Sequence, residues 1–191
     1  MVPSLPSAVL AMFRIPIEKH LDLALLEHRH APMLFAVVEE NRDHLRRYLP
    51  WVDNTRTVND SAGFIQATLE QFARSQSLST GIFFHGSLAG VIGYHTIDWA
   101  NRRTALGYWL ASGYQGHGLM TRAVRAMTTH AFTALSLHRM EIRAATENKR
   151  SRSVAERSGF KFEGTCRGAE WLHDRFVDHA VYGVLASEWK G

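Results

Sequence analysis

Apolar residues change their spacing abruptly around the middle of the chain. Residues 106–110 form an almost continuous apolar run, which is typical of a buried strand. A turn with Gly116 and Gly118 follows. Beyond it the apolar residues recur at the spacing of one helix face, namely Leu119, Ala123, Val124, Met127, Ala131 and Leu135. The pattern therefore predicts a strand, a glycine-rich loop and a helix in direct succession.

The first quarter of the chain predicts a strand and two helices. Residues 13–17 form a candidate strand, and Pro16 favours an edge position because proline cannot donate a ladder hydrogen bond. Two helices should follow at residues 31–41 and 42–48. They should end before Pro50, since the residue before a proline is pushed out of the helical region.

A third helix and a meander of strands should precede the glycine-rich loop. Asn59 or Asp60 can cap this helix. Its buried stripe should comprise Phe64, Ile65, Leu69 and Phe72. Residues 81–85 and 88–97 predict an antiparallel hairpin, and a further turn leads into the strand at residues 104–110.

The last third of the chain predicts further strands and one short helix. Residues 138–144 alternate apolar and polar, as a half-buried strand does. A helix over residues 151–158 should stop at Gly159, and residues 160–165 and 176–185 should pair as the final strands. The strands at residues 104–110 and 138–144 are joined by a crossover through the helix that begins near Gly118. We therefore expect these two strands to be parallel neighbours.

Composition fits one globular domain over residues 1–191, with residues 1–12 as a candidate flexible tail. The chain is 46% hydrophobic, enough for a sizeable core at this length. No apolar run approaches the ~20 residues of a membrane span, and the N-terminus lacks the charged start of a signal peptide. We therefore expect a cytoplasmic protein without a membrane partner.

The charge and the reactive residues limit which ligands and partners we expect. The net charge is +4, and the Lys and Arg residues are interleaved with acids. This pattern gives little support for nucleic acid binding, so no nucleic acid partner is expected. Positive potential does suit an anionic cofactor or an acidic partner. Cys166 is the only cysteine and is expected to be a semi-buried strand residue. The 11 histidines show no spacing typical of a metal site, so no metal is expected.

The glycine-rich loop is the first candidate site. A helix N-terminus presents unpaired N–H groups and a partial positive charge. Because Gly116 and Gly118 have no Cβ, the backbone of residues 115–121 can approach a phosphate or pyrophosphate closely. The loop matches neither G-x-G-x-x-G nor G-x-x-x-x-G-K-[ST]. On its own, a lone Gly-x-Gly favours a turn that only caps the helix.

The stretch from Gln115 to Met120 resembles the Q/R-x-x-G-x-G/A pyrophosphate loop of the GNAT family of acyl-CoA N-acyltransferases. Met120 departs from the final small residue, as is familiar in the branch of ribosomal-protein N-terminal acetyltransferases that contains RimJ and RimL. Other residues match that branch in order and spacing: Asn148, Ser151, Val154, Gly159, Phe160, Glu163, Gly164, Ala169 and Glu170. The resemblance extends from about Leu21 to Val184.

This resemblance implies an α+β GNAT fold. Its central sheet would be mixed and mostly antiparallel, flanked by helices, with splayed parallel strands at the CoA site. The backbone of Trp109 and Leu110 would bind pantetheine, and the Leu110 N–H would face the developing oxyanion. The pyrophosphate would be bound by Gln115, Gly116, His117, Gly118, Leu119, Met120 and Thr121.

The resemblance also implies catalytic residues. Many GNAT enzymes use a tyrosine as general acid seven residues after the motif asparagine, but here that place after Asn148 is taken by Ala155. The role would then fall to Ser151, which without the resemblance is simply a helix cap. Asn148 would bind pantetheine amides. Arg150 and the neighbouring basic residues would either reach the CoA phosphates or form a solvated helix face.

Glu170 lies 19 residues after Ser151, where this branch places its proposed general base. An α-amino group titrates near ~7.7–8.0, so a weak base is sufficient. Glu163 is the next candidate, or it only bridges strands. Trp51, in the Leu-Pro-Trp element, either packs in the core or forms a wall of the substrate cleft. Glu170 and Trp51 are therefore the candidate substrate-binding residues.

The implied activity is N-acetyl transfer from acetyl-CoA by direct attack of the acceptor amine. The preferred acceptor is the N-terminal α-amino group of a protein or peptide. The alternatives are an enzyme that inactivates a toxic amine or antibiotic, a longer acyl donor such as succinyl-CoA, and a non-catalytic acyl-CoA sensor. Exposed edge strands would allow a homodimer.

Overall fold

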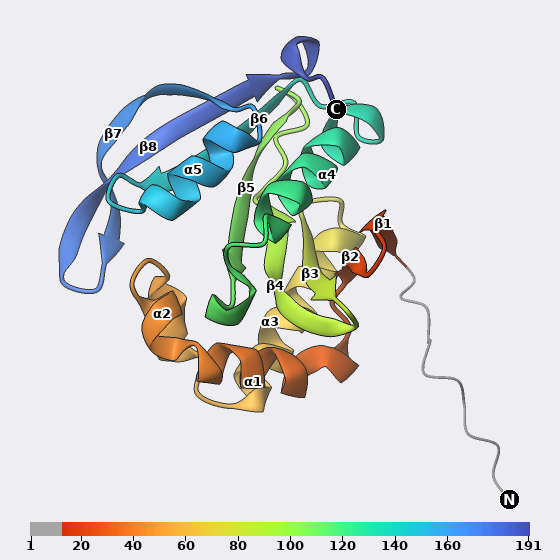
Figure 1. Ribbon diagram of the computed structural model, residues 1–191, viewed down its shortest axis with the longest axis vertical. Helices are drawn as coiled ribbons and strands as arrows, with labels where there is room; N and C mark the ends of the chain where they lie inside the picture. Colours follow the sequence, from red (N-terminus) through yellow and green to blue (C-terminus); the bar gives the residue numbers. More distant parts are fainter. Residues whose placement is uncertain (1–12) are drawn as a thin grey trace, which may run out of the picture.

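A computed structural model describes residues 13–191, and the candidate tail at residues 1–12 lies outside the described residues. All eight strands form one sheet in the order β1-β2-β3-β4-β5-β6-β8-β7 (Figure 1). The strands are β1 Arg14–Glu18, β2 Leu21–Leu25, β3 Leu78–Phe84, β4 Ser87–Tyr94, β5 Arg103–Leu110, β6 Arg139–Ala145, β7 Lys161–Leu172 and β8 Arg175–Leu185. Among the strands of residues 13–191, only β5 and β6 pair in parallel. The predicted meander and the predicted parallel neighbours are both confirmed.

Helices cover both faces of this sheet. The α-helices are α1 Ala31–Glu40, α2 Arg42–Arg46, α3 Val58–Ala73, α4 Leu119–Thr133 and α5 Lys149–Arg157. Short 3₁₀ helices occur at η1 His28–His30, η2 Pro50–Asn54, η3 Ser112–Tyr114 and η4 Ala186–Glu188. Helices α4 and α5 lie over one face of the sheet, while α1 and α3 cover the opposite face (Figure 1).

The two faces of β5 bury different side chains because successive residues of a strand point to opposite sides. Leu106, Tyr108 and Leu110 pack against the cluster that contains the inner face of α4. Trp109 packs against the cluster formed with α1 and α3. A third, small cluster joins Tyr48, just after α2, to the ends of β6, β7 and β8. Thus α2 lies on the same side of the sheet as Trp109.

The structure corrects the expected third helix. Its N-cap is Thr57, whose side chain accepts the Asp60 N–H in a capping box, so the helix begins earlier than Asn59 or Asp60 would set it. The buried residues of α3 are Ser61, Ile65 and Thr68. Phe64 and Phe72, expected inside, are exposed. Ile65 is buried as expected and Leu69 packs against the core, so only the two aromatic residues of the predicted stripe lie outside it.

Other differences concern short or edge elements. Strand β2 was not predicted, because Asp22 interrupts its five residues, although Leu21 and Leu23 are fully buried. The last helix begins at Lys149 with Asn148 as its cap, two residues before the expected start. Cys166 is exposed rather than semi-buried, since it lies on β7, the edge strand.

Within residues 13–191, every helix is too short or too polar to cross a bilayer.

Several partly buried histidines predict how stability depends on pH. Burial lowers the pKa of His30, His44 and His130. The folded state therefore binds fewer protons than the unfolded state below the ordinary histidine pKa of about 6.5, so the free energy of unfolding falls as the pH falls through this range. We expect the melting temperature to drop between about pH 7 and pH 5. In thermal melts, His130→Gln should have a shallower pH dependence than the wild type; an unchanged dependence would contradict this account of His130.

Candidate active site

The glycine-rich loop leads directly into α4. Gly116 and Gly118 have φ angles of 83° and 70°, a backbone region that disfavours other residues. A Cβ added to either glycine would meet no atom within 4 Å, so the space beside both stays open. Gly118 is the N-cap of α4 and supplies no side-chain cap. The N–H groups of the first turn of α4 therefore lack a capping side chain, as an anion-binding helix start requires.

Two buried polar atoms lie in this first turn without a hydrogen-bond partner among the described residues. They are the Thr121 hydroxyl and the Arg122 Nε. Buried polar groups in native proteins are normally paired, so both atoms suit an anionic ligand at the loop. Leu119 and Met120 are buried in the core and can offer only backbone groups. His117 is exposed, and its carbonyl accepts a hydrogen bond from Arg122.

Gln115 connects the loop to two other elements. Its amide nitrogen lies 2.7 Å from His44 Nε2 on α2, and its amide oxygen accepts a hydrogen bond from Arg150 on α5. His44 also hydrogen-bonds the Leu110 backbone, which opposes the lowering of its pKa by burial. Arg150, Gln115, His44 and Leu110 thus form one chain of contacts. The role of His44 was not predicted, because a single histidine on a helix gives no signal in the sequence.

Strands β5 and β6 separate partway along their length. Their parallel pairing runs from Arg103↔Arg139 to Leu106↔Ile142 and then stops. Beyond Leu106, β5 pairs only with β4, and the rest of β6 pairs only with β8. A gap therefore opens between the two central strands, toward the end of β5 from which the glycine-rich loop departs.

Hydrogen-bond alternation shows which β5 residues face this gap. Ala111 N–H donates to the Ala89 carbonyl at 2.8 Å, so Ala111 and every second residue before it direct their polar backbone groups toward β4. Trp109 belongs to that set and does not offer its backbone to the gap, contrary to the expectation from the sequence. Tyr108 and Leu110 direct their N–H and C=O groups into the gap instead.

Ser151 lies beside the same gap on the first turn of α5. The Asn148 side chain accepts the Ser151 N–H at 3.1 Å, so Asn148 is the helix cap and the Ser151 hydroxyl is not used for capping. The Ser151 hydroxyl lies 3.1 Å from the Tyr108 hydroxyl, which also lies 3.2 Å from the Ser151 carbonyl. Burial raises the pKa of Tyr108 to about 12, so its hydroxyl stays protonated. A role for Tyr108 was not predicted from the sequence.

Glu170 lies on the opposite side of the sheet, the side of α2. Its carboxylate oxygen Oε2 is 3.0 Å from His179 Nε2 on β8. Glu170 pairs with Val177, whose side chain packs with Ala145 and Leu172. Glu163, the other candidate carboxylate, forms an ion pair with Arg139 that lowers the pKa of Glu163. It therefore bridges β7 to β6, the structural alternative predicted for it.

Most of the chain matches a known protein family. Residues 20–161 match the sequence model described as "Acetyltransferase (GNAT) domain". The chain belongs to the GNAT acetyltransferase family. The GNAT chain is 33% identical to YdaF of Bacillus subtilis, which is named provisionally as a ribosomal N-acetyltransferase, over 94% of this chain and 99% of YdaF. It is 29% identical to the ribosomal-protein-serine acetyltransferase of Escherichia coli over 90% of this chain and 96% of the relative.

Solved GNAT structures support the same assignment. The complex of the ribosomal α-N-protein acetyltransferase RimL with coenzyme A has a TM-score of 0.88 and 27% identity, covering 91% of this chain and 98% of RimL. The microcin C7 self-immunity acetyltransferase MccE, in complex with acetyl-CoA and AMP, has a TM-score of 0.87 and 26% identity, covering 90% and 95%. This GNAT chain is therefore an acetyl-CoA-dependent N-acetyltransferase.

Acetyl-CoA fits the residues present. When bound, it supplies an acetyl group activated as a thioester. The open space at Gly116 and Gly118 and the unpartnered Thr121 hydroxyl suit its pyrophosphate. The backbone groups of Tyr108 and Leu110 suit its pantetheine, in the gap that the resemblance to GNAT proteins predicted.

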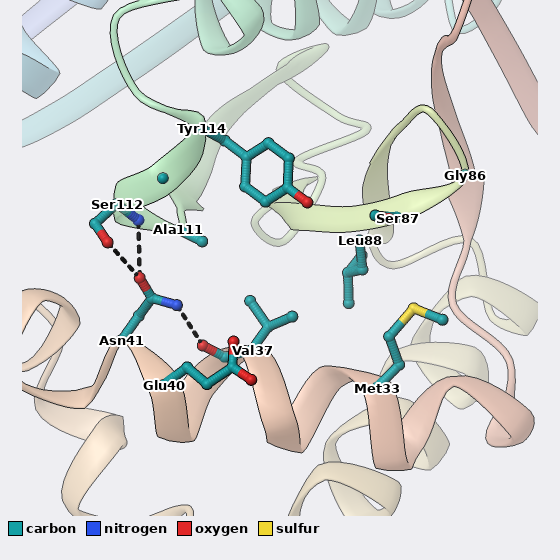
Figure 2. A pocket seen from close by; sticks show the side chains of 11 residues that line it. Met33, Val37, Glu40, Asn41, Gly86, Ser87, Leu88, Ala111, Ser112 and Tyr114 are labelled. Carbon is teal, nitrogen blue, oxygen red and sulfur yellow. Dashed lines mark hydrogen bonds between the residues drawn. The ribbon is translucent and has the colours of Figure 1, made fainter.

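A cavity of about 440 Å³ lies between α1, the β3–β4 turn and η3 (Figure 2). Asn41 Oδ1 accepts hydrogen bonds from the N–H and hydroxyl of Ser112, each at 2.8 Å, and Asn41 Nδ2 donates to the Val37 carbonyl (Figure 2). These contacts fasten α1 to η3, just before the glycine-rich loop. Neither Ser151 nor Glu170 lines this cavity.

A second cavity, of about 260 Å³, lies on the α2 side of the sheet and includes Val177, the strand partner of Glu170, but not Glu170 itself. It is lined by Tyr48, Ala145, Thr146, Glu147, Leu172, Arg175, Phe176, Val177 and Asp178. Trp51 lines neither cavity. It is half-buried in η2, with its ring centroid 6.1 Å from that of Trp109, as a packing residue would be.

Proposed function

We propose that this enzyme acetylates the N-terminal α-amino group of a protein or peptide. One observation supports this acceptor above others. Two relatives that match along nearly their whole length are named for ribosomal or ribosomal-protein acetylation. Spermidine N(1)-acetyltransferase of Escherichia coli is matched over 49% of this chain, and the ribosomal-protein uS5-alanine N-acetyltransferase of Escherichia coli over 44%.

The two faces of the sheet suit two parts of this reaction. The acceptor amine enters from the α2 side, where Val177, the strand partner of Glu170, lines the cavity beside Tyr48. The thiol part of the donor lies toward α5, where Ser151 and Tyr108 are joined by their hydroxyl groups. The gap between β5 and β6 connects the two sides.

Each group has a chemical role in the proposal. The Leu110 N–H donates to the carbonyl oxygen as it gains negative charge, and such a backbone donor contributes about 3 kcal/mol to transition-state stabilisation. The Ser151 hydroxyl donates a proton to the departing sulfur, and the Tyr108 hydroxyl, which accepts the Ser151 O–H in the structure, positions that side chain beside the gap. Glu170 and its neighbour His179 remove a proton from the incoming ammonium group.

A small-molecule amine is the second candidate acceptor. It is favoured by the likeness to MccE, a self-immunity enzyme, which has a TM-score as high as most of the RimL structures. The second cavity, at about 260 Å³, is also large enough for part of a small molecule.

A substrate panel separates the two acceptors. Release of free thiol from acetyl-CoA should be followed with peptides that begin with Ser, Thr or Ala, and with free amino acids, polyamines and aminoglycosides. Turnover confined to the peptides is the expected result. Turnover confined to the small amines would replace the proposed acceptor with the second candidate, and binding of acetyl-CoA without any turnover would indicate a sensor.

Glu170→Gln should impair the enzyme most at low pH. An acceptor α-amino group is largely protonated below its pKa of ~7.7–8.0, so deprotonation by the protein matters most there. We expect kcat/KM for a Ser-initiated peptide to fall about 100-fold near pH 6.5 and much less near pH 9. Glu40→Gln, which removes an exposed carboxylate from α1, is the matched control and should have wild-type kinetics. A deficit of equal size at every pH would argue against a role in proton removal.

A further inference from the structure

The Glu170 carboxylate lies within hydrogen-bonding distance of a histidine side chain. Glu170 Oε2 and His179 Nε2 are 3.0 Å apart, on neighbouring strands β7 and β8. A regular ladder would not align them in this way. Cys166 pairs with His179 and Glu170 pairs with Val177, so β7 contains two more residues than β8 between these pairs. In this irregular segment the Gly168 N–H donates to the Asp178 carboxylate at 2.8 Å, which holds the extra residues in place.

The contact defines which nitrogen of His179 is available. A carboxylate can only accept hydrogen bonds, so His179 Nε2 carries the proton that points at Glu170. In the neutral ring Nδ1 then holds the free electron pair. Nδ1 has no hydrogen-bond partner within residues 13–191. A histidine oriented by a carboxylate, with its second nitrogen free, is the arrangement of a general base.

His179 also lies closer to the gap than Glu170 does. The strand order places β8 directly beside β6, whereas Glu170 is on β7, one strand further away. His179 pairs with Ala145, the last residue of β6 and a lining residue of the cavity beside Tyr48. Its side chain is 16% exposed, so it is sheltered but open to a ligand.

We propose that His179 is the catalytic residue that takes the proton of the acceptor amine, and that Glu170 is a positioning residue that holds the ring. The inference rests on the proposed function for its acceptor. His179 Nδ1 accepts a proton from the ammonium group, and the freed nitrogen pair forms the new bond to the acetyl carbon. The carbon–sulfur bond breaks with its electrons on sulfur, which takes the Ser151 hydroxyl proton. The nitrogen loses its second proton to water as the amide forms, and water restores the Ser151 hydroxyl. The imidazolium then returns its proton to water. Imidazole is a stronger base than a carboxylate, so it is better matched to an amine.

The tautomer can be measured without acetyl-CoA or any acceptor. Long-range ¹H–¹⁵N correlation spectra of the histidine side chains, assigned with His179→Gln, report which ring nitrogen carries the proton. We expect the Nε2–H form for His179 in the wild type and loss of this preference in Glu170→Ala. Finding the proton on Nδ1 of the neutral ring in the wild type would overturn the proposal, because no electron pair would face the acceptor.

Kinetics then distinguish catalysis from structure. His179→Gln should lower kcat about 100-fold with an unchanged dissociation constant for acetyl-CoA. The double variant with Glu170→Gln should be no slower than His179→Gln alone, because the two residues act as one unit. Added imidazole should restore part of the activity of His179→Ala, a response that a merely structural histidine would not give. His138→Gln, at an exposed position, is the control and should match the wild type.

Two results would overturn the role of His179. One is a His179→Gln variant within about threefold of the wild type while Glu170→Gln stays impaired, which would make Glu170 the direct base. The other is a slow His179→Ala variant that imidazole does not rescue and whose loss adds fully to that of Glu170→Gln. Failure of the proposed acceptor can be distinguished from failure of the proposed role of His179. If the wild type acetylates only small amines, the same variants are compared on those amines. If the wild type acetylates no amine at all, His179 is not a catalytic base, whichever tautomer it adopts.

Discussion

Replacing Gly118 with aspartate will weaken acetyl-CoA binding by about 100-fold, because a carboxylate at the start of α4 repels the pyrophosphate. Gly118 is the N-cap of this helix, and the space beside its Cα is open. An aspartate there would also cap the free N–H groups that the pyrophosphate needs. Isothermal titration with acetyl-CoA measures the loss directly.

Gly118→Asn is the matched control for this variant. Asparagine has the size of aspartate, also caps helices and tolerates the left-handed backbone that Gly118 adopts at φ 70°. The difference between the two variants therefore isolates the negative charge. We expect the asparagine variant to lose about tenfold or less in affinity, and both to melt within a few degrees of each other. Equal affinity of the aspartate variant and the wild type would refute the assignment of the loop.

Removing the Ser151 hydroxyl will lower kcat about 100-fold and leave the affinity for acetyl-CoA nearly unchanged. The helix cap is Asn148, so Ser151→Ala should not unravel α5. Ser153→Ala, which removes a half-buried hydroxyl from the same helix, is the control and should keep wild-type activity. Single-turnover rates together with acetyl-CoA titrations test both parts of the expectation.

Tyr108→Phe completes this test. The Tyr108 hydroxyl lies 3.1 Å from that of Ser151, so the two groups should act together. The double variant should then be about as slow as Ser151→Ala alone. If the two losses instead add fully, or if Ser151→Ala weakens binding as much as it slows turnover, Ser151 has a structural role and not that of a proton donor.

The strand, loop and helix around Gly118 could be predicted from the sequence because each has a strong local signal. The apolar run, the glycines and the helical spacing lie within about thirty residues and do not depend on distant partners. Glu170 and Ser151 followed from the family pattern. The buried face of α3 was predicted only in part: Ile65 is buried as expected, whereas Phe64 and Phe72 are exposed, and the cap is Thr57 instead of Asn59 or Asp60.

The residues that were missed depend on contacts between distant parts of the chain. Tyr108 meets Ser151 across 43 positions, and His44 meets Gln115 across 71. Both partners come from different elements, so neither contact leaves a local pattern. The choice of Trp109 failed for a different reason. Which residues of β5 face the gap depends on the register with β4, and the sequence of β5 alone does not contain that register.

The central claim is that the acetyl group is transferred to an N-terminal α-amino group, and tandem mass spectrometry tests it most directly. The enzyme and acetyl-CoA should be incubated with a Ser-initiated peptide that contains one internal lysine, and with the same peptide blocked at its N-terminus. We expect acetylation of the free α-amino group and no modification of the blocked peptide. Acetylation of the lysine in both peptides, or of neither peptide while a small amine is acetylated, would contradict it.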